Sequence, residues 1–483
     1  MPSGLTRARI VSLLHRVEDE YPVAEWTIGG TRVWPLIRID VALRLRRQVA
    51  LGVMPSAEVK HRSMAGILAA WLRDASKEDL PLGPRDVIMF GISAGKTRTE
   101  RGYYSPNTDP LVQAMREKGA RVLAVERDKH NDLSFPRAYP SLYMNYSLTG
   151  PIRRVLRKYV RMCGSEMHLP RFEEVASAIE EIGGPPARPS RGRALEIYQR
   201  VKVYKLLYSA LLRMARPRVA VVHCFYSFDS FAIVWACKEQ RIPCFDYQHG
   251  VQGRFHYAYS DWRRIPVHGY EMLPNGFLVW DDQSADNILR WAPRGMRVGK
   301  IGNLWHARSE GMRDEFAAAI AKLKRQAGGR AIALFTLQAH VPAKWVLEAI
   351  RGSAEVFWLA RLHPLHQEIR SPIMRGLSGV ENVNIELAST LPLPALLDIA
   401  SVHVTGNSSV VLEARMLGMR SIVLDKVGVE YYAELIDEGT VAHAGSAAEL
   451  QAQVKACVTA GGIASRFAAN AAPVDPLSFM LDS

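Results

Sequence analysis

The sequence predicts an α/β protein with two doubly wound domains that face each other across a cleft. Strand-like apolar runs alternate with helix-like segments, which is typical of parallel sheets covered by helices on both faces. The alternation occurs twice, on either side of a turn-rich stretch around Pro266 and Pro274. The length of 483 residues is sufficient for two or three domains.

The expected elements of the first half begin with a helix at the N-terminus and a hairpin turn at Gly29-Gly30. Strands are expected at 85–93, 121–126, 218–226 and 242–250, and helices at 109–119 and 229–240, with a helical and basic insertion over about 150–215. We therefore expect an N-terminal Rossmann-like domain at 1–268 that binds the acceptor.

The expected elements of the second half repeat the pattern. Strands are expected at 276–282, 297–303, 330–338, 355–364, 383–387, 402–406 and 421–425, and helices near Pro342, at 394–400 and after 409. We therefore expect a nucleotide-binding domain at 269–465 and a C-terminal tail at 466–483.

The composition narrows the functional class. Five cysteines without a CxxC pair indicate neither a disulfide framework nor a zinc site, so no metal is expected. No apolar run reaches the ~18 residues of a membrane span, and the N-terminus lacks a secretory pattern, which favours a cytoplasmic protein.

The formal charge of +14 is concentrated between Arg153 and Arg218. Without a nucleic-acid-binding motif, this favours a peripheral contact with an anionic membrane surface over nucleic acid.

Polar side chains gather at the ends of predicted strands in the second half. Ligands collect at this edge of an open parallel sheet. Serines at the first turn of a helix either cap it or hold a phosphate, and the strand-end histidines are either structural or part of a site. The candidates are Gln338 and His340, Arg361 and His363, Ser389 and Thr390, Asn407, Ser408 and Ser409, and Glu413, which is one turn beyond Ser409.

A second group of candidates belongs to the first half. His249 follows a predicted strand in the run Gln248-His249-Gly250, and a histidine suits general-base work because its ordinary pKa is ~6.5. A buried structural histidine is the alternative. The run GISAGKT is one residue short of a phosphate loop, yet its strand-end position suggests that Ser93, Lys96 and Arg98 face an acceptor. Gln248 and Asp281 are expected on the same acceptor side.

The order of these motifs resembles a known family. QHG (248–250), then LHP (362–364), then GNSS (406–409) before an ExxxLG helix is similar to bacterial GT-B glycosyltransferases of surface-polysaccharide synthesis. HP and SS motifs occur in sialyl- and Kdo-transferases, where they bind the CMP of the donor. A strand-end HG and a serine pair occur in teichoic-acid and capsule polymerases.

The resemblance implies a division of roles. The donor phosphate would be held by His363, Arg361, Asn407, Ser408 and Ser409. The base on the acceptor side would be His249. Nucleotide and ribose contacts would fall to Gln338, His340, Ser389, Thr390 and Glu413. The nucleotide sugar would be a substrate, so no cofactor is expected.

The predicted activity is therefore transfer of a sugar from a nucleotide-sugar donor to a glycan or lipid-linked acceptor in capsule or lipopolysaccharide synthesis. The preferred donor is a CMP-linked Kdo or sialic-acid-like sugar. The expected location is the inner face of the cytoplasmic membrane. Three alternatives stay open: a polyol-phosphate transferase of the teichoic type, a UDP-sugar epimerase of the same architecture, and an inactive nucleotide-binding scaffold.

Overall fold

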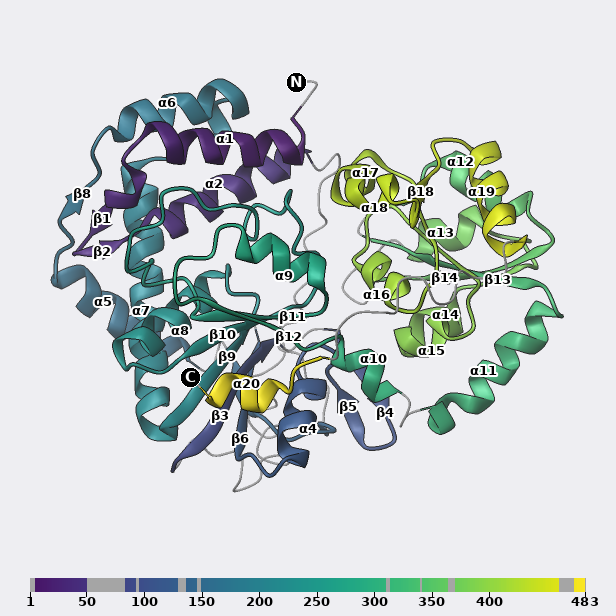
Figure 1. The fold of residues 1–483 in the computed structure, drawn as a ribbon, viewed down its shortest axis with the longest axis horizontal. Coiled ribbons are helices and arrows are strands. Elements are labelled where there is room, and N and C mark those ends of the chain that lie inside the picture. Colours follow the sequence, from purple (N-terminus) through teal and green to yellow (C-terminus); the bar gives the residue numbers. More distant parts are fainter. Residues whose placement is uncertain are drawn as a thin grey trace.

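The fold consists of two α/β domains that lie side by side (Figure 1). The computed structural model describes residues 5–49, 83–92, 95–128, 136–145, 149–309, 313–338, 341–363, 370–459 and 473–482. The first domain is drawn in purple to teal and the second mostly in green to yellow. No helix within these ranges is long and apolar enough to cross a membrane.

The first domain is built on an open parallel sheet. Within the described ranges its seven strands have the order β12-β11-β10-β9-β3-β6-β7. Every pairing is parallel, which confirms the predicted βαβ alternation. The strands are β3 (Arg85–Ile92), β6 (Val122–Asp128), β7 (Leu142–Asn145), β9 (Pro217–His223), β10 (Cys244–Tyr247), β11 (Gly276–Val279) and β12 (Arg297–Lys300).

The second domain repeats this plan with six strands among the described residues, in the order β15-β14-β13-β16-β17-β18. All pairings are again parallel. The strands are β13 (Ala331–Thr336), β14 (Val356–Arg361), β15 (Val383–Asn384), β16 (Val402–Thr405), β17 (Ser421–Val423) and β18 (Val441–His443). Two open sheets facing a shared cleft are the GT-B architecture that the resemblance implies.

Helices cover both sheets, and the described residues also form a three-stranded antiparallel sheet, β2-β1-β8, and an antiparallel pair, β4-β5. The helices of the first domain are α1 (Arg7–Glu20), α2 (Trp34–Val49), α4 (Asp109–Glu117), α5 (Gly150–Met162), α6 (Phe172–Gly183), α7 (Arg191–Ala215), α8 (Phe228–Glu239) and α9 (Asp282–Leu289). Those that follow β12 are α10 (Leu304–Ser309), α11 (Arg313–Ala327), α12 (Lys344–Arg351), α13 (Arg370–Gly376), α14 (Glu386–Thr390), α15 (Leu393–Leu397), α16 (Val410–Met416), α17 (Lys426–Tyr431), α18 (Ala433–Asp437), α19 (Ala447–Thr459) and α20 (Pro476–Leu481). The short strands are β1 (Thr27–Ile28), β2 (Thr31–Arg32), β4 (Thr97–Thr99), β5 (Gly102–Tyr104) and β8 (Met167–His168).

The predicted domain boundary at 268 falls inside the first sheet. β11 pairs with β10, with Phe245 opposite Gly276, and β12 extends the same sheet, so the second sheet begins only at β13. The tail assigned to 466–483 also contributes to the first domain, because α20 packs there and buries Met480 among residues of its strands. The turn-rich stretch near Pro266 is therefore a loop within the first domain.

One predicted strand is shorter than expected and runs into a helix. Only Val383 and Asn384 of the 383–387 segment join the sheet, and α14 begins two residues later. The Asn384 side chain accepts hydrogen bonds from the backbone N–H groups of Leu387 and Ala388, which starts the helix. Ser389 and Thr390 thus lie in a short helix and not at a strand end.

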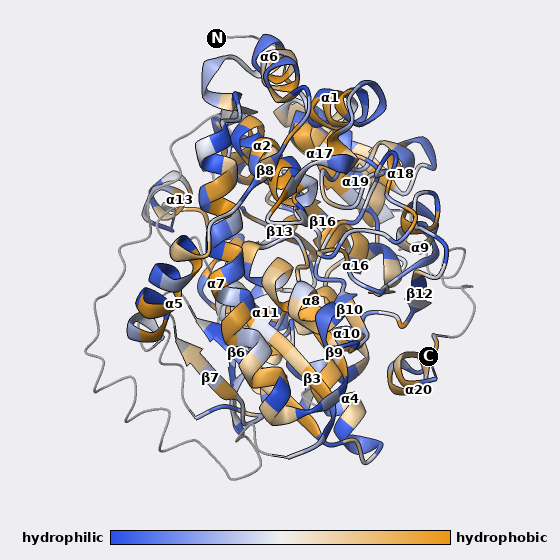
Figure 2. Ribbon diagram, turned by 90° about the vertical axis from the view of Figure 1, so that its left-hand side faces the viewer, coloured by the Kyte–Doolittle hydropathy of each residue, from blue (hydrophilic) through white to orange (hydrophobic). Residues whose placement is uncertain are grey.

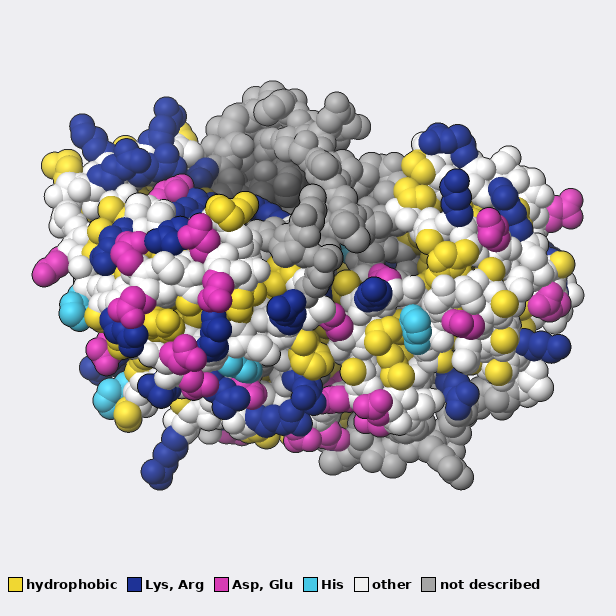
Figure 3. All heavy atoms as spheres, turned by 90° about the horizontal axis from the view of Figure 1, so that it is seen from above, with side chains coloured by type: hydrophobic (Ala, Val, Ile, Leu, Met, Phe, Trp, Pro, Cys, Tyr) yellow, Lys and Arg dark blue, Asp and Glu magenta, His cyan; other side chains and the backbone are white. Residues whose placement is uncertain are grey.

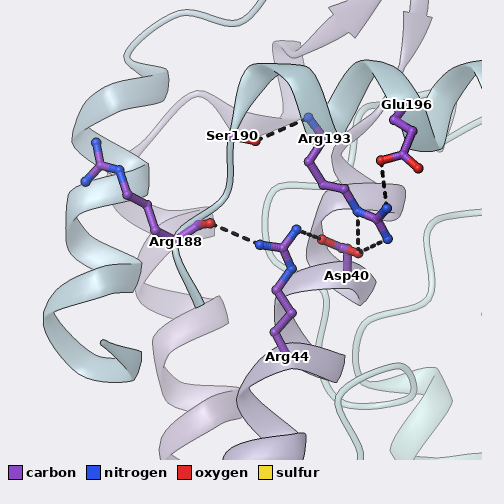
Figure 4. A network of polar contacts seen from close by, with 6 residues as sticks. All are labelled: Asp40, Arg44, Arg188, Ser190, Arg193 and Glu196. Carbon is purple, nitrogen blue, oxygen red and sulfur yellow. Dashed lines mark hydrogen bonds and ion pairs between the residues drawn. The ribbon is translucent and has the colours of Figure 1, made fainter. Parts of the chain in front are cut away.

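The N-terminal region forms a layer on the first domain. The predicted hairpin is present as β1 and β2, with Gly29 and Gly30 at φ values of 55° and 77°. Figure 4 shows how α2 is tied to the start of α7: the Asp40 carboxylate accepts hydrogen bonds from the Arg193 guanidinium, at 3.1 Å from Nη2, and forms an ion pair with Arg44 at 2.7 Å. Ser190 caps α7 by accepting from the Arg193 N–H at 3.2 Å.

Substituting Gly276 by Ala is expected to destabilise the protein by about 1–3 kcal/mol, because overpacking forces backbone shifts. A Cβ at this position would lie 2.3 Å from the Arg297 carbonyl oxygen and 2.8 Å from the Phe245 ring. Urea denaturation would measure the change in the free energy of unfolding. Gly192→Ala in α7 is the control, since nothing lies within 4 Å of its Cβ position, and it is expected to be neutral or slightly stabilising. Equal stability of both variants would contradict the prediction.

Candidate functional site

The candidate site is a cleft between the two domains, with a volume of about 710 Å³. Ligand pockets of enzymes are typically ~300–1,000 Å³. One side, here called the first wall, comes from the carboxyl ends of β3, β9 and β10, and the other, the second wall, from those of β13, β14 and β16. The strand order reverses between β3 and β9 in the first sheet and between β13 and β16 in the second. Open α/β sheets bind ligands at such a reversal, outside the carboxyl ends of the strands.

Most of the predicted site residues line this cleft. They are Lys96, Arg98, Gln248, His249, Gln338, Arg361, His363, Ser389, Thr390, Ser408, Ser409 and Glu413. Ser93 and His340 lie outside the described residues. Asn407 and Asp281 do not line the cleft.

Two histidines stand next to each other on the first wall. His223 ends β9 and His249 follows β10, and their ring centroids are 4.4 Å apart. The Tyr226 hydroxyl lies 3.4 Å from His249 Nε2. Burial lowers the pKa of His249 to about 4, and it lowers the pKa of His223 well below the ordinary value, assisted by His249 and Arg127. Both imidazoles are therefore neutral at pH 7.

The loop that carries His249 is held by Gln248. The Gln248 side-chain amide donates hydrogen bonds to the Gly250 carbonyl at 2.9 Å and to the Ser284 hydroxyl at 3.1 Å, and its oxygen accepts from the Trp280 N–H at 2.6 Å. All of its polar groups are engaged within the protein. Gln248 thus positions the His249 loop, and its contact with an acceptor stays a prediction.

Arg361 brings positive charge to the second wall. Its guanidinium donates hydrogen bonds to the carbonyl oxygens of Ala388, at 2.7 Å, and Leu391, at 2.5 Å. Burial lowers its pKa to about 10, while Glu413 acts in the opposite direction, so Arg361 remains a cation at pH 7. Ser389 supports the same segment, because its hydroxyl accepts from the Leu362 N–H at 3.1 Å.

The two serines differ in their surroundings. Ser408 is buried, its carbonyl accepts from the Tyr432 hydroxyl at 2.7 Å, and its side chain accepts a long hydrogen bond of 3.4 Å from the Val410 N–H. Ser409 precedes α16 without a capping hydrogen bond from its side chain. Ser409 lies against the first wall, since a Cβ at Gly250 would be 3.7 Å from the Ser409 Cβ. Because α16 has only seven residues, its dipole adds little, and the charge at this wall comes from side chains.

Glu413 faces the cleft but already has a partner. Its carboxylate lies 2.9 Å from His306 Nε2 and accepts a long hydrogen bond of 3.5 Å from the Asn303 amide. Asn303 lies between β12 and α10, so this contact joins the two domains beside the site. Contact of Glu413 with a ribose stays a prediction.

Four predicted residues are used in other ways. Asn407 donates a hydrogen bond of 2.9 Å to the Asp425 carboxylate, and Asp281 caps α9 by accepting from the Ser284 N–H at 2.7 Å. Short polar side chains after a strand serve turns and caps as readily as ligands, which the sequence does not distinguish. Lys96 pairs with the buried Glu126, and the Thr390 hydroxyl donates to the Glu386 carbonyl at 3.2 Å, although both residues line the cleft.

The cleft contains residues that the sequence analysis did not identify. His223 is the most important of them, and it obeys the rule applied elsewhere, since it is a polar residue at the carboxyl end of a parallel strand. The aromatic residues Tyr103, Trp280 and Trp305 also line the cleft, and Arg370 adds a cation from α13. Tyr103 lies in β5, Trp305 in α10 and Arg370 in α13, which are short elements outside the predicted strands and helices.

Comparison with known proteins yields structural likeness alone. No family model and no curated protein matches the sequence. Similar solved structures include UDP-GlcNAc 2-epimerase from Neisseria meningitidis bound to UDP-GlcNAc, with 16% identity over 82% of this chain and 97% of that chain and a TM-score of 0.47. UDP-GlcNAc 2-epimerase from Methanocaldococcus jannaschii, in complex with UDP-GlcNAc and UDP, has 12% identity over 82% and 98% and a TM-score of 0.47. A spinosyn rhamnosyltransferase complexed with spinosyn aglycone has 13% identity over 78% and 93% and a TM-score of 0.43. At these values the likeness assigns neither a substrate nor a reaction to this chain.

Proposed function

We propose that the protein is an enzyme that binds a nucleotide-linked sugar in the interdomain cleft and breaks the bond between the sugar and the phosphate. The observation that carries this proposal is the division of the cleft. One wall presents Arg361, His363 and two serines, and the opposite wall presents two neutral histidines. A cleft with anion-binding groups on one side and a proton acceptor on the other suits displacement of a phosphate by a hydroxyl.

The proposed reaction is glycosyl transfer. The bond from the anomeric carbon to the phosphate oxygen breaks, and a bond from that carbon to an acceptor hydroxyl oxygen forms. The second wall stabilises the charge that develops on the leaving phosphate. His249 accepts the proton of the hydroxyl, and the neutral His223 packs against its ring.

The finer assignments are proposals of the same kind. A CMP-linked sugar is the preferred donor on the basis of the HP and SS motifs, and the acceptor is a glycan or lipid-linked glycan of a bacterial surface polysaccharide. The basic character of the first domain fits work at an anionic membrane surface.

Epimerisation of a UDP-sugar is the second candidate. A reaction of this kind removes and returns a proton at a carbon of the sugar and needs titratable groups on both of its faces. The carboxylate of Glu413, with His306 at 2.9 Å, lies in the second wall opposite the histidines and provides such a group. Incubation with each nucleotide sugar alone would separate the candidates, because an epimerase changes the sugar without an acceptor whereas a transferase requires one.

A nucleotide that occupies the cleft is expected to raise the melting temperature, since a ligand at 100-fold its Kd stabilises a protein by ~2.7 kcal/mol. CMP, CDP, UDP, GDP and ADP would be titrated against wild type and a Ser408→Ala/Ser409→Ala variant. A rise with one nucleotide in wild type and its loss in the variant would support the phosphate site and identify the donor class.

The matched control is Ser446→Ala/Ser478→Ala, because these serines lie outside the cleft and should leave the shift unchanged. No shift with any nucleotide or nucleotide sugar would contradict the proposed function. A shift that survives in the Ser408→Ala/Ser409→Ala variant would contradict the role of the serines alone.

A further inference from the structure

Helix α5 presents two stripes to solvent, and neither of them lines the cleft. Its apolar residues Ile152, Val155, Tyr159 and Met162 are exposed by 55%, 71%, 57% and 77%. Their spacing of three, four and three residues places them along one line of the helix. A monomeric protein seldom leaves a continuous apolar stripe in water unless it meets an apolar phase or a partner there.

A row of cations runs beside the apolar stripe. Arg154, Arg157, Lys158 and Arg161 are exposed and share a surface hollow with Met162. The sequence from 149 to 165 contains neither Asp nor Glu, so no acidic side chain of the helix neutralises the row. Figure 1 and Figure 2 place α5 at one corner of the first domain, which is where Lys and Arg gather at the upper left of Figure 3.

The remaining side of the helix is fixed to the protein. Val160 is fully buried, and the Arg153 guanidinium donates a hydrogen bond of 2.9 Å to the Tyr204 hydroxyl of α7. The helix is therefore held with its apolar and cationic stripes both facing outward. Lys and Arg beside an apolar stripe are typical of helices that lie in the interface of a membrane.

We propose that α5 docks the protein on a bilayer that contains anionic lipids, with the apolar stripe entering the headgroup region and the cation row contacting lipid phosphates. Charge complementarity selects this occupant over an apolar protein surface, because four adjacent cations would lose their water against an apolar partner. This docking gives a structural basis to the membrane contact in the proposed function, and vesicle binding can be measured whether or not the reaction in the cleft occurs.

The test uses the full-length protein and co-sedimentation with vesicles of phosphatidylcholine, alone or with about one third phosphatidylglycerol. Binding is expected to the anionic vesicles and to fall steeply with salt. Arg154→Glu/Arg157→Glu/Lys158→Glu should weaken it by at least roughly 100-fold, since each cation near such a surface contributes about fivefold and each new carboxylate is repelled by the surface in addition. The control Lys322→Glu/Lys324→Glu/Arg325→Glu makes the same charge change on exposed residues of α11 and should leave binding within about threefold.

Entry of the apolar stripe needs a second readout. An NBD fluorophore on Val155→Cys, in a Cys163→Ser background, should shift its emission to the blue on anionic vesicles; the remaining cysteines are buried or partly buried. Labelled Cys163→Ser protein without the new cysteine is the blank. The proposal is overturned by absence of vesicle binding, by equal loss in the α11 control, or by binding without a blue shift. Unchanged circular dichroism of the charge variant would show that its loss of binding is not a loss of fold.

Discussion

Substituting His249 by Gln is expected to lower the turnover of a nucleotide sugar by about 100-fold or more, because positioned general bases typically contribute 10²–10⁴-fold. His249 lies on the first wall of the cleft, and its pKa of about 4 keeps it neutral in the free enzyme. Negative charge of a bound phosphate raises that pKa and makes the imidazole a better proton acceptor. Glutamine retains much of the shape and polarity of the imidazole but cannot take the proton. Nucleotide affinity, measured by thermal shift, is expected to change little, since the phosphate is bound by the second wall.

The pH profile tests the same role independently of the loss of turnover. In the free enzyme His249 becomes protonated, and can no longer act as a base, only as the pH falls toward its pKa of about 4. The acid limb of the kcat/KM profile should therefore lie near pH 4. A bound phosphate brings negative charge close to the imidazole and raises its pKa, which should move the acid limb of kcat to higher pH. The limb assigned to His249 should be absent from whatever activity the His249→Gln variant retains.

His268→Gln is the matched control, because His268 is exposed and lies outside the cleft. Its turnover should equal that of wild type. Turnover of His249→Gln within about threefold of wild type would rule out His249 as the base.

Substituting Arg38 by Met is expected to destabilise the protein by about 3–5 kcal/mol, because it leaves a buried carboxylate without its cation. Arg38 is fully buried in α2, and its Nε donates a hydrogen bond of 2.7 Å to Glu18 of α1. The same guanidinium donates to the carbonyl oxygens of Tyr257 and Asp261, in the segment that follows the His249 loop. Equilibrium denaturation in urea would measure the loss.

Two further variants show whether the unpaired charge is the cause. Glu18→Gln/Arg38→Met removes both charges and should be less destabilised than Arg38→Met alone, because a neutral amide is less costly to bury than a carboxylate. Arg16→Met also breaks an ion pair, but Arg16 and Glu181 are exposed by 40% and 75%, so the change should stay within about 1 kcal/mol. If Arg38→Met were as mild as Arg16→Met, the buried pair would not hold this layer.

The alternation of apolar runs and helical patterns was sufficient to predict two parallel sheets, because strand and helix periods are local properties of the chain. Strand ends could be located for the same reason. His249, Arg361, His363, Ser408 and Ser409 were selected by their position after strands, and all of them line the cleft. The carboxyl ends of parallel strands meet at one edge, so a one-dimensional pattern was enough to collect them.

The domain boundary and the fate of individual polar groups depended on tertiary structure. β11 and β12 look the same in sequence whether they close the first sheet or open the second, and only their pairing with β10 decides it. Asn407 and Asp281 sit at positions as promising as Ser409, yet both are hydrogen-bonded within the protein as a turn contact and a cap. Which side chain remains available to a ligand is decided by the neighbours that folding places around it.

Taken by itself, the sequence determined the α/β class, the repetition of the pattern and the strand-end sets of polar residues, since each depends on residues close together in the chain. The tertiary structure alone decided that His223 stands 4.4 Å from His249, that Gly250 meets Ser409 across the cleft, and that α5 turns its apolar stripe outward. Those relations join segments far apart in the chain or depend on what the rest of the chain covers, and packing fixes them where local periodicity has no influence.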